Sequence, residues 1–364
     1  MGEAGAVQSR IVRPPRIGIV VVNWCRWADT LECLEGVFKL ENFGGPIVVV
    51  DNGSTDNSVD IIRCWARGDL DILPQNNNPD IRRVIFPPVS KPLSVRNFRP
   101  GLDGKMELSS TCHLILVEIG RNIGYAAGNN IGIKLLMDRG DIDLVWLINN
   151  DAVPASTACT ELMAAVGDHV DDAYICGSLI AEYWKPRTIQ AVGGRYNRWL
   201  GTVRHELAGH ELGCVKKLSG RYPVDYPIGA GLAASRAYIE RYGLMDESYF
   251  LYYEEVDWCL RRGYPTTAFV ATRSVVYHKG GSSTGAASRA NDRSLLADYY
   301  QLRGRILLAR NFSRLILFTT VIGNAVSIIS RLFRTKGGVF LNAVRATWDG
   351  LRGTGGKRLD DRRF

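Results

Sequence analysis

The first half of the chain alternates continuous apolar runs with amphipathic segments. Residues 17–22 and 47–50 are β-branched runs typical of strands buried on both faces, and each is followed by apolar residues at helical spacing. Further apolar runs at 114–117 and 144–148 enclose another helical pattern, which reaches Met137. Strands that alternate with helices form a parallel sheet, so the pattern predicts an α/β fold with a mostly parallel central sheet flanked by helices.

The helix after the first apolar run has a start signal. Asp29, with Glu32 three residues later, makes a capping-box pattern, in which side chains bind the free N–H groups of the first turn. Leu31, Leu34 and Phe38 then mark one apolar face of the helix. We therefore expect Asp29 and Glu32 to serve the helix terminus.

The periodicity is less regular in the rest of the chain. Between about 68 and 111 it dissolves, and six of the fourteen prolines lie there, so we expect a surface excursion and not a domain. The second half is mixed, with a helix at 158–166 and strands near 174–180 and 269–277. From residue 295 onward the pattern predicts a helical, basic region.

Polar residues follow the predicted strands where each strand ends. Asp51 ends the second apolar run, and Asn149, Asn150 and Asp151 end the run at 144–148. Because the carboxyl ends of parallel strands meet at one edge of a sheet, we expect these side chains to face one ligand crevice. Asn and Asp are also ordinary turn residues, so a purely structural role stays open for each of them.

Composition and charge narrow the class of protein. Hydrophobic residues make up 46% and charged residues 23%, as in globular proteins. The net charge of +8 is local, because residues 301–364 hold 13 Lys and Arg against 3 Asp and Glu, which leaves −2 for the rest. The eight cysteines have no zinc-ligand spacing, and the N-terminus has no apolar run of a signal peptide. We expect a cytosolic protein with reduced thiols.

Two groups of residues could carry chemistry. Asp151 and His278 offer a carboxylate and an imidazole, which suit a divalent cation that holds a diphosphate. Glu255 lies among aromatic residues, where its pKa would rise, and could act as a base toward a hydroxyl. Against this, His278 could be a packed histidine, and Glu254, Glu255 and Asp257 could form a charged helix face.

A third pattern points elsewhere. Residues 229–234 (GAGLAA) fit the G-x-G-x-x-A signature of a dinucleotide-binding turn. Pro227 interrupts the strand that should precede such a turn. We therefore expect no nicotinamide or flavin site here.

Six sequence blocks in order resemble the family-2 glycosyltransferases, in particular their rhamnosyltransferase-like branch. The blocks are VVNW, VVDNGSTDNS, GRNIGYAAGNN, WLINND, PIGAGLAASRAYIERYGLMDESYFLYYEEVDWCLR and H-x-x-G-x-S, between residues 17 and 283. The resemblance implies a GT-A fold, inverting transfer from a nucleotide sugar, and Mg²⁺ or Mn²⁺ as cofactor. We expect a flexible N-terminus (1–15), a catalytic domain (16–290) with a nucleotide-sugar half (16–152) and an acceptor half (153–290), and a basic C-terminal helical region (291–364).

The resemblance also implies roles for single residues. Asp51 matches the aspartate that binds the pyrimidine base, Glu255 the catalytic base, and Asp151 the last position of the metal-binding DxD, with His278 as a second ligand. The first DxD position is Asn149, which offers only a neutral carbonyl. Implied nucleotide-sugar contacts are Asn23, Asp51, Arg121, Asn122, Gly124, Asn129, Asn149 and Asn150, and implied acceptor-side or supporting residues are Gly229, Ala230, Glu254 and Asp257.

The C-terminal region suits a membrane-linked acceptor. The apolar stretch at 315–330 has 16 residues, fewer than the roughly 20 that span a bilayer, and is interrupted by Gly323 and Asn324. Its flanks are cationic, which is typical of a helix lying on an anionic leaflet. A core-packing or dimerisation helix is the open alternative, and a homo-oligomer is compatible with the sequence.

The resulting hypothesis is a hexosyltransferase at the inner face of the cell membrane. By resemblance we expect L-rhamnose from dTDP-rhamnose as donor, a glycolipid or polysaccharide hydroxyl as acceptor, and no nucleic-acid partner. A transferase that uses a UDP-sugar, such as galactofuranose or GlcNAc, is one alternative. A sugar-nucleotide pyrophosphorylase is another, although residues 23–29 lack the glycine-rich phosphate loop it needs. A non-catalytic nucleotide-sugar-binding protein is the third.

Overall fold

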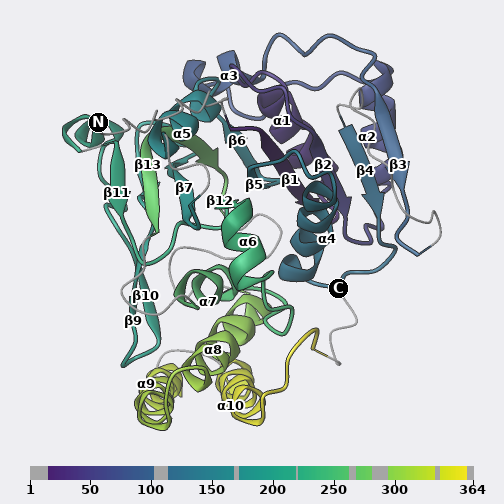
Figure 1. Ribbon diagram of the computed structural model, residues 1–364. Helices are drawn as coiled ribbons and strands as arrows, with labels where there is room; N and C mark the ends of the chain where they lie inside the picture. The colour runs from purple at the N-terminus through teal and green to yellow at the C-terminus, as the bar shows by residue number, and fades with distance from the viewer. Residues whose placement is uncertain are drawn as a thin grey trace, which may run out of the picture.

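The computed structural model describes residues 15–101, 114–167, 172–218, 220–261, 268–280, 294–332 and 337–358. Within them, one large sheet has the strand order β11-β13-β7-β12-β5-β1-β2-β4-β3, with β6 and β8 paired to β13 and β7. Figure 1 shows this sheet with helices packed on it and three further helices at one end of the molecule. The bounds of its strands are β1 Ile17–Asn23, β2 Ile47–Asp51, β3 Val95–Phe98, β4 Leu114–Glu118, β5 Leu144–Asn149, β6 Ala152–Pro154, β7 Ile175–Glu182, β8 Ile189–Ala191, β11 Arg221–Pro223, β12 Gly231–Ser235 and β13 Phe269–His278.

Helices cover both faces of the sheet because alternate strand residues point to opposite sides. Ile19 and Val21 of β1 belong to a core that α1, α2 and α5 complete, whereas Val20 belongs to a core with α4, α6 and α7. A two-stranded ribbon, β9 with β10, lies outside the large sheet. The bounds of these elements are α1 Trp27–Val37, α2 Ser58–Arg67, α3 Pro79–Ile85, α4 Tyr125–Asp138, α5 Ala158–Val166, α6 Arg236–Tyr242, α7 Glu254–Leu260, β9 Gly194–Asn197, β10 Thr202–His205 and the 3₁₀ helix Leu212–Lys217.

The predicted α/β fold is confirmed. β3, β4, β2, β1 and β5 run parallel, and β12 is antiparallel to both of its neighbours, β5 and β7. The register places Asn23 beside Asp51 and Val22 beside Asn149. The polar ends of these strands therefore lie at the same edge of the sheet, as the sequence pattern predicts.

Two segments take a form that local pattern did not indicate. The described part of the excursion at 68–111 contains α3, whose Ile81, Val84 and Ile85 enter the core, and the edge strand β3. The GAGLAA segment ends in β12, a strand paired on both sides. It is not a turn that leads from a strand into a helix, so the dinucleotide signature is a coincidence of sequence.

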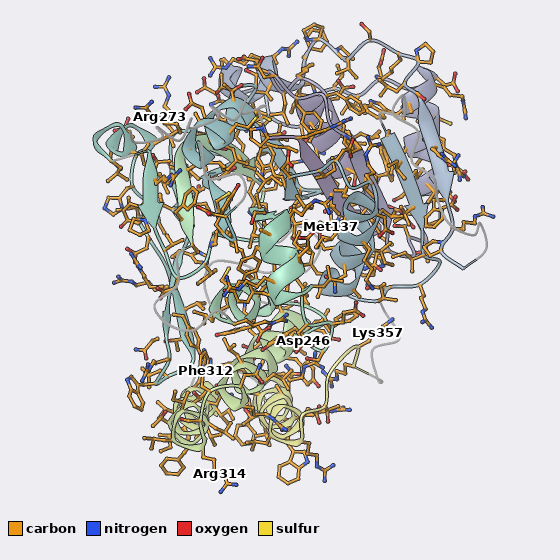
Figure 2. All side chains as sticks on the ribbon, viewed as in Figure 1. Met137, Asp246, Arg273, Phe312, Arg314 and Lys357 are labelled. Carbon is orange, nitrogen blue, oxygen red and sulfur yellow. The ribbon has the colours of Figure 1, made fainter. Side chains whose placement is uncertain are left out.

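Three helices follow the sheet: α8 (Leu295–Arg310), α9 (Arg314–Leu332) and α10 (Gly337–Arg352). They pack against one another below α7 in the view of Figure 1. Arg314, at the start of α9, points away from the rest of the molecule (Figure 2). In the described part of the chain, no helix combines the length and the apolar character needed to cross a bilayer.

Candidate active site at the carboxyl edge of the sheet

The ends of β1 and β2 are joined by buried side chains. The Nδ2 atom of Asn23 donates to Oδ2 of Asp51 at 2.8 Å and to Oγ of Ser54 at 3.0 Å, and Oδ1 of Asp51 accepts from the Ser54 backbone N–H at 3.0 Å. Thr30 of α1 donates to Oδ1 of Asn23 at 2.7 Å. Asn23 and Asp51 are both almost fully buried. Asp51 is thus held rigidly at the strand end, where a ligand would approach.

The turn that follows β4 is packed closely against the turn after β2. Asn52 donates to Oδ1 of Asn122 at 3.1 Å, and its own Oδ1 accepts from the Ile123 N–H at 3.0 Å. Gly53 has a φ of +74°, and a Cβ there would lie 2.4 Å from the backbone of Arg121. Only glycine fits such an approach. Arg121 and Asn122, two of the residues predicted to contact the nucleotide, are therefore packed against the turn that follows Asp51.

Tyr125, the first residue of α4, connects the strand ends to the second half of the chain. Its hydroxyl lies 2.8 Å from Oδ1 of Asn149 and 3.0 Å from the carbonyl oxygen of Gly229. Burial first, and then the charges of Glu254 and Glu255 and that of Asp151, raise the pKa of this hydroxyl. All three carboxylates therefore act on one tyrosine.

Asp151 and His278 lie together, with Oδ1 and Nε2 3.1 Å apart. Nδ1 of His278 lies 2.8 Å from Oε1 of Gln190, an acceptor, so in the neutral ring Nδ1 carries the proton and Nε2 presents a lone pair. Nδ2 of Asn149 lies 3.5 Å from Nε2 of His278. The backbone N–H of Lys279 donates to the carbonyl oxygen of Asp151 at 3.0 Å, which fixes the two strand ends against each other.

This pair fits a divalent cation. Neighbouring ligands on a Mg²⁺ with bonds of roughly 2.1 Å lie about 3 Å apart, close to the separation of the two atoms. The side-chain amide of Gln190 binds the other ring nitrogen and so orients the imidazole, as hydrogen-bond partners do for histidine ligands in metal sites. No group of three or more His, Cys, Asp or Glu suited to a metal occurs among the residues that the structure describes. Such a pair suits a cation that takes its other ligands from phosphate oxygens and water.

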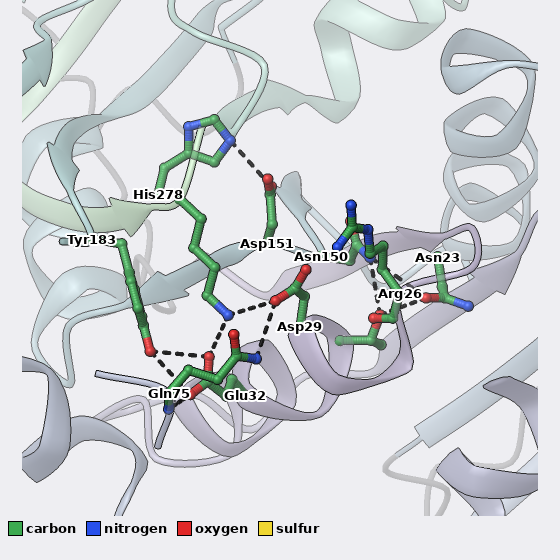
Figure 3. A network of polar contacts seen from close by, with 11 residues as sticks. Asn23, Arg26, Asp29, Glu32, Gln75, Asn150, Asp151, Tyr183 and His278 are labelled. Atoms are coloured by element: carbon green, nitrogen blue, oxygen red, sulfur yellow. Dashed lines mark hydrogen bonds and ion pairs between the residues drawn. The ribbon is translucent and has the colours of Figure 1, made fainter. Parts of the chain in front are cut away.

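A buried charge network lies directly behind this pair (Figure 3). The ammonium of Lys279 contacts Oδ1 of Asp29 at 2.6 Å and also Oε2 of Glu32. The Tyr183 hydroxyl donates to Glu32 at 3.0 Å, and the Gln75 amide donates to Asp29 at 3.2 Å. All three charged groups are buried. The network ties α1 to the chain segment that carries His278.

The predicted capping box is therefore wrong. α1 begins at Trp27 with Arg26 as N-cap, and no side chain caps it. Asp29 and Glu32 face the interior instead of the helix terminus, because the buried ammonium of Lys279 offers a stronger partner than the N–H groups of the first turn. Sequence spacing identified two correctly placed carboxylates but not the distant cation that decides their orientation.

Glu254 and Glu255 begin α7. Glu254 is buried and Glu255 is largely so, and Oε2 of each has no hydrogen-bond partner among the residues that the structure describes. Burial raises the pKa of Glu255 to about 7, although the N–H groups of Glu255 and Val256 oppose the shift. Burial and the charge of Glu255 raise the pKa of Glu254. Glu255 is therefore the carboxyl of this pair that can gain or lose a proton near neutral pH.

The segment that precedes this pair is strained. Phe250, Tyr252 and Tyr253 have φ values of +64°, +64° and +72°, a conformation that costs large side chains free energy. A Cβ on Gly124 would lie 2.7 Å from the carbonyl oxygen of Phe250, so the nucleotide-side turn packs directly on it. Arg303 of α8, itself buried, donates to the Tyr249 carbonyl at 2.7 Å. These contacts hold the strained backbone in place, as at many active sites.

Four further predicted residues hold the surrounding elements together. Asp257 accepts from Arg261 at 2.8 Å and from Asn311 at 3.1 Å, so both of its oxygens are engaged. Asn129 donates to the Tyr125 carbonyl one turn earlier in α4, at 3.0 Å. Asn150 donates to Oγ1 of Thr30 at 3.1 Å, which secures the strand end against α1. The carbonyl oxygen of Ala230 accepts from the Asn149 N–H at 3.4 Å.

Sequence reasoning missed Tyr125, Gln190 and Lys279 as site residues. Lys279 follows His278 directly, and Tyr125 lies inside the GRNIGYAAGNN block, so their positions in quoted motifs were the available signal. Gln190 lies on β8, and nothing in the surrounding sequence marks it.

The chain is similar to known glycosyltransferases, although no family model matches it. The low-salt glycan biosynthesis hexosyltransferase Agl10 of Haloferax volcanii is 28% identical over 149 residues, 40% of this chain and 45% of that protein. The dTDP-rhamnosyl transferase RfbF of Shigella flexneri is 24% identical over 257 residues, 67% of this chain and 81% of that protein. The first match thus spans less than half of that relative's length.

A solved structure supports the same class of fold. The crystal structure of GalNAc-T7 with UDP, GalNAc and Mn²⁺ superimposes with a TM-score of 0.55 at 11% identity, covering 93% of this chain and 56% of that one. The predicted GT-A fold is confirmed. The predicted resemblance is confirmed as well, since both relatives in sequence are glycosyltransferases.

Proposed function

We propose that the chain transfers a sugar from a nucleotide diphosphate donor to an acceptor hydroxyl, with inversion at the anomeric carbon. The observation that carries this proposal is the position of Tyr125, whose hydroxyl lies 2.8 Å from Oδ1 of Asn149 and whose N–H donates at 2.7 Å to the carbonyl of Phe250, in the segment that leads into Glu254. A diphosphate site at the strand ends and a candidate base on α7 therefore flank one point. Direct transfer needs this arrangement.

In the proposed reaction Glu255 takes the proton of the acceptor hydroxyl. The hydroxyl oxygen forms its bond to the anomeric carbon on one face while the bond to the diphosphate oxygen breaks on the other. A carboxylate with a pKa near 7 is a stronger base than an ordinary one and is still ionised at neutral pH in part of the molecules. Glu255, where aspartate is common in the family, needs only hydrogen-bond reach to that hydroxyl.

Asp151 and His278 would hold the metal ion. Mg²⁺ or Mn²⁺ bound there supplies positive charge to the departing diphosphate. The carbonyl oxygen of Asn149 lies 2.8 Å from the Tyr125 hydroxyl and is neutral, so it attracts a cation less than a carboxylate would. We propose that His278 takes over the share of metal binding that a carboxylate has at the first DxD position in the family.

We assign binding of the nucleotide-sugar donor to the turns after β2 and β4, which pack against each other. We propose that Asp51, fixed by Asn23, binds the pyrimidine base. The two turns that contain Gly53 and Gly124 would then contact the nucleotide through their backbone, with Arg121 beside it. The similarity to a dTDP-rhamnosyl transferase supports dTDP-rhamnose as donor. A UDP-sugar is the alternative, since GalNAc-T7 was crystallised with UDP.

We further propose a glycolipid or polysaccharide acceptor and action at the inner face of the cell membrane, where the basic C-terminal region would lie.

The experiment that tests the activity is incubation of the purified chain with a panel of nucleotide sugars, with Mn²⁺ and with a chelator, while donor hydrolysis is followed. Hydrolysis of one donor that stops with chelator and returns with Mn²⁺ is the expected result. Calorimetric titration with dTDP and UDP accompanies it. Metal-independent binding without turnover would favour a non-catalytic role, and a panel with neither binding nor turnover would refute the proposal.

A further inference from the structure

Helices α9 and α10 are packed with their polar and small residues inward. On α9 the fully buried side chains include Thr320 and Asn324. Asn324 donates to the Leu302 carbonyl at 3.3 Å and to Oγ1 of Thr347 at 3.1 Å, and accepts from Arg305 at 2.9 Å. Asn324, which interrupts the apolar pattern in the sequence, therefore joins the three C-terminal helices from inside.

Eight large apolar residues of the two helices are exposed. Five on α9 are 48–62% exposed and recur every three or four residues, and three on α10 are 42–67% exposed with the same spacing. No charged residue lies between positions 315 and 329. We call this surface the C-terminal apolar face, and its residues are Leu315, Phe318, Ile322, Val326, Ile329, Leu341, Val344 and Trp348.

This distribution of exposed and buried residues is the reverse of that in a helix that borders water. A surface helix of a globular protein buries its apolar stripe and exposes its polar one. Here, two neighbouring helices expose their stripes together, and apart from Ile316 the buried positions are taken by asparagine, threonine, alanine and glycine. A contiguous apolar face of this kind marks a surface that another apolar phase covers.

The charged residues around the C-terminal apolar face indicate what covers it. Arg314 and Arg352 are exposed beside the apolar residues, and the Arg352 guanidinium lies 4.7 Å from the Trp348 ring centre. Among the described residues of α9 and α10 the single acidic side chain, Asp349, accepts from Tyr299 at 2.6 Å and pairs with Arg345. The linking sequence at 333–336, outside the described residues, adds two cations. A second copy of the chain would bring the same cations against this rim, whereas an anionic lipid leaflet complements it.

We infer that the C-terminal apolar face docks the protein on an anionic membrane, with α9 and α10 lying in the leaflet surface instead of crossing it. The inference deepens, and rests on, the proposed action at a membrane. It also has a consequence for the site, because α8 lies between this face and the strained segment before Glu254: Arg303 holds that segment, and Phe250 stacks on Tyr300 at 5.0 Å. Docking would bring the proposed base toward acceptors held at the leaflet.

The test is flotation of the full chain with phosphatidylcholine vesicles, with and without phosphatidylglycerol. Wild type should float with the anionic vesicles and less with the neutral ones. Replacing Phe318 and Val326 together by serine should weaken partitioning by at least about tenfold, because both side chains lose their transfer into the leaflet. Leu73→Ser is the matched control, since Leu73 is 77% exposed in the segment before α3 and should leave partitioning unchanged.

Each outcome separates this inference from the proposed activity. Unchanged partitioning of the double variant, indifference of the wild type to lipid charge, or dimerisation through this face without vesicle binding would each overturn the inference. Thermal unfolding of the variants should match wild type, because the replaced side chains are exposed. Donor hydrolysis in vesicle-free solution should also be unchanged. Vesicle binding without any donor hydrolysis would refute the proposed transferase and leave membrane docking in place.

Discussion

Replacing Glu255 by glutamine removes the proposed base and also a buried ionisable group, so activity and stability should change in opposite directions. General base catalysis typically contributes 10²–10⁴-fold, and we expect a loss of transfer of about that size with nucleotide affinity retained. In the wild-type chain, transfer should rise with pH through about 7, as Glu255 loses its proton. The measurements are a pH–rate profile and a calorimetric titration of each protein.

The stability effect follows from the raised pKa of the Glu255 carboxyl. Between its ordinary value of 4.5 and about 7, the folded chain binds a proton that the unfolded chain has lost. Stability therefore falls as pH rises through this window, by about 1 kcal/mol at pH 5 and by about 3 kcal/mol at pH 8. Glutamine carries no such penalty. Glu255→Gln should thus raise the free energy of unfolding by up to about 3 kcal/mol at pH 8 and by only about 1 kcal/mol at pH 5.

Glu254→Gln is the matched control, because it removes the other carboxylate of the pair from the same helix start. It should also stabilise the protein above pH 7, since burial and Glu255 raise the pKa of Glu254. Transfer should be largely retained. Urea unfolding at pH 5 and pH 8 measures both variants. Normal transfer by Glu255→Gln would refute its assignment as the base, and lower stability of that variant at pH 8 would refute the burial argument.

Further predictions concern the elements that hold the site. Lys279→Met leaves two buried carboxylates on α1 without a cation and should cost about 3–5 kcal/mol in urea unfolding; a loss below about 1 kcal/mol would show that this network is not a structural one. Gly124→Ala places a methyl group against the Phe250 backbone and should cost several kcal/mol, whereas Gly140→Ala, at φ +75° with open space around it, should cost only about 1–2 kcal/mol; equal losses would contradict the close approach. Asp151→Asn should weaken Mn²⁺-dependent nucleotide binding by at least about tenfold in calorimetry, and metal-independent binding should persist; an unchanged Mn²⁺ response would place the metal elsewhere.

Much of the sheet could be predicted from the sequence because burial imposes a local signal. A strand buried on both faces needs a continuous β-branched run, and such runs located β1, β2, β4 and β5 within a residue or two. The edge strand β3 and helix α3 were not predicted, since the proline-rich sequence around them hides the hydrophobic periodicity. Their packing depends on neighbours contributed by other segments.

The site residues also divide into those that the sequence revealed and those that it did not. Asp51, Asn149 and Asp151 were found because strand ends are visible in the sequence. The partner of each polar group was not visible: Tyr125 engages Asn149, and Gln190 orients His278. Such pairs join segments far apart in the chain, and no local rule selects one polar residue over another.

The sequence by itself determined the strands, their polar ends and the apolar, cation-flanked character of α9, because each follows from the order of residues along the chain. Only the tertiary structure decided that Lys279 takes the carboxylates of Asp29 and Glu32, and that Asn324 faces inward while Phe318 faces outward. Periodicity shows that a helix has two faces, but which face is buried depends on the charges, hydrogen bonds and shapes that other elements present to it.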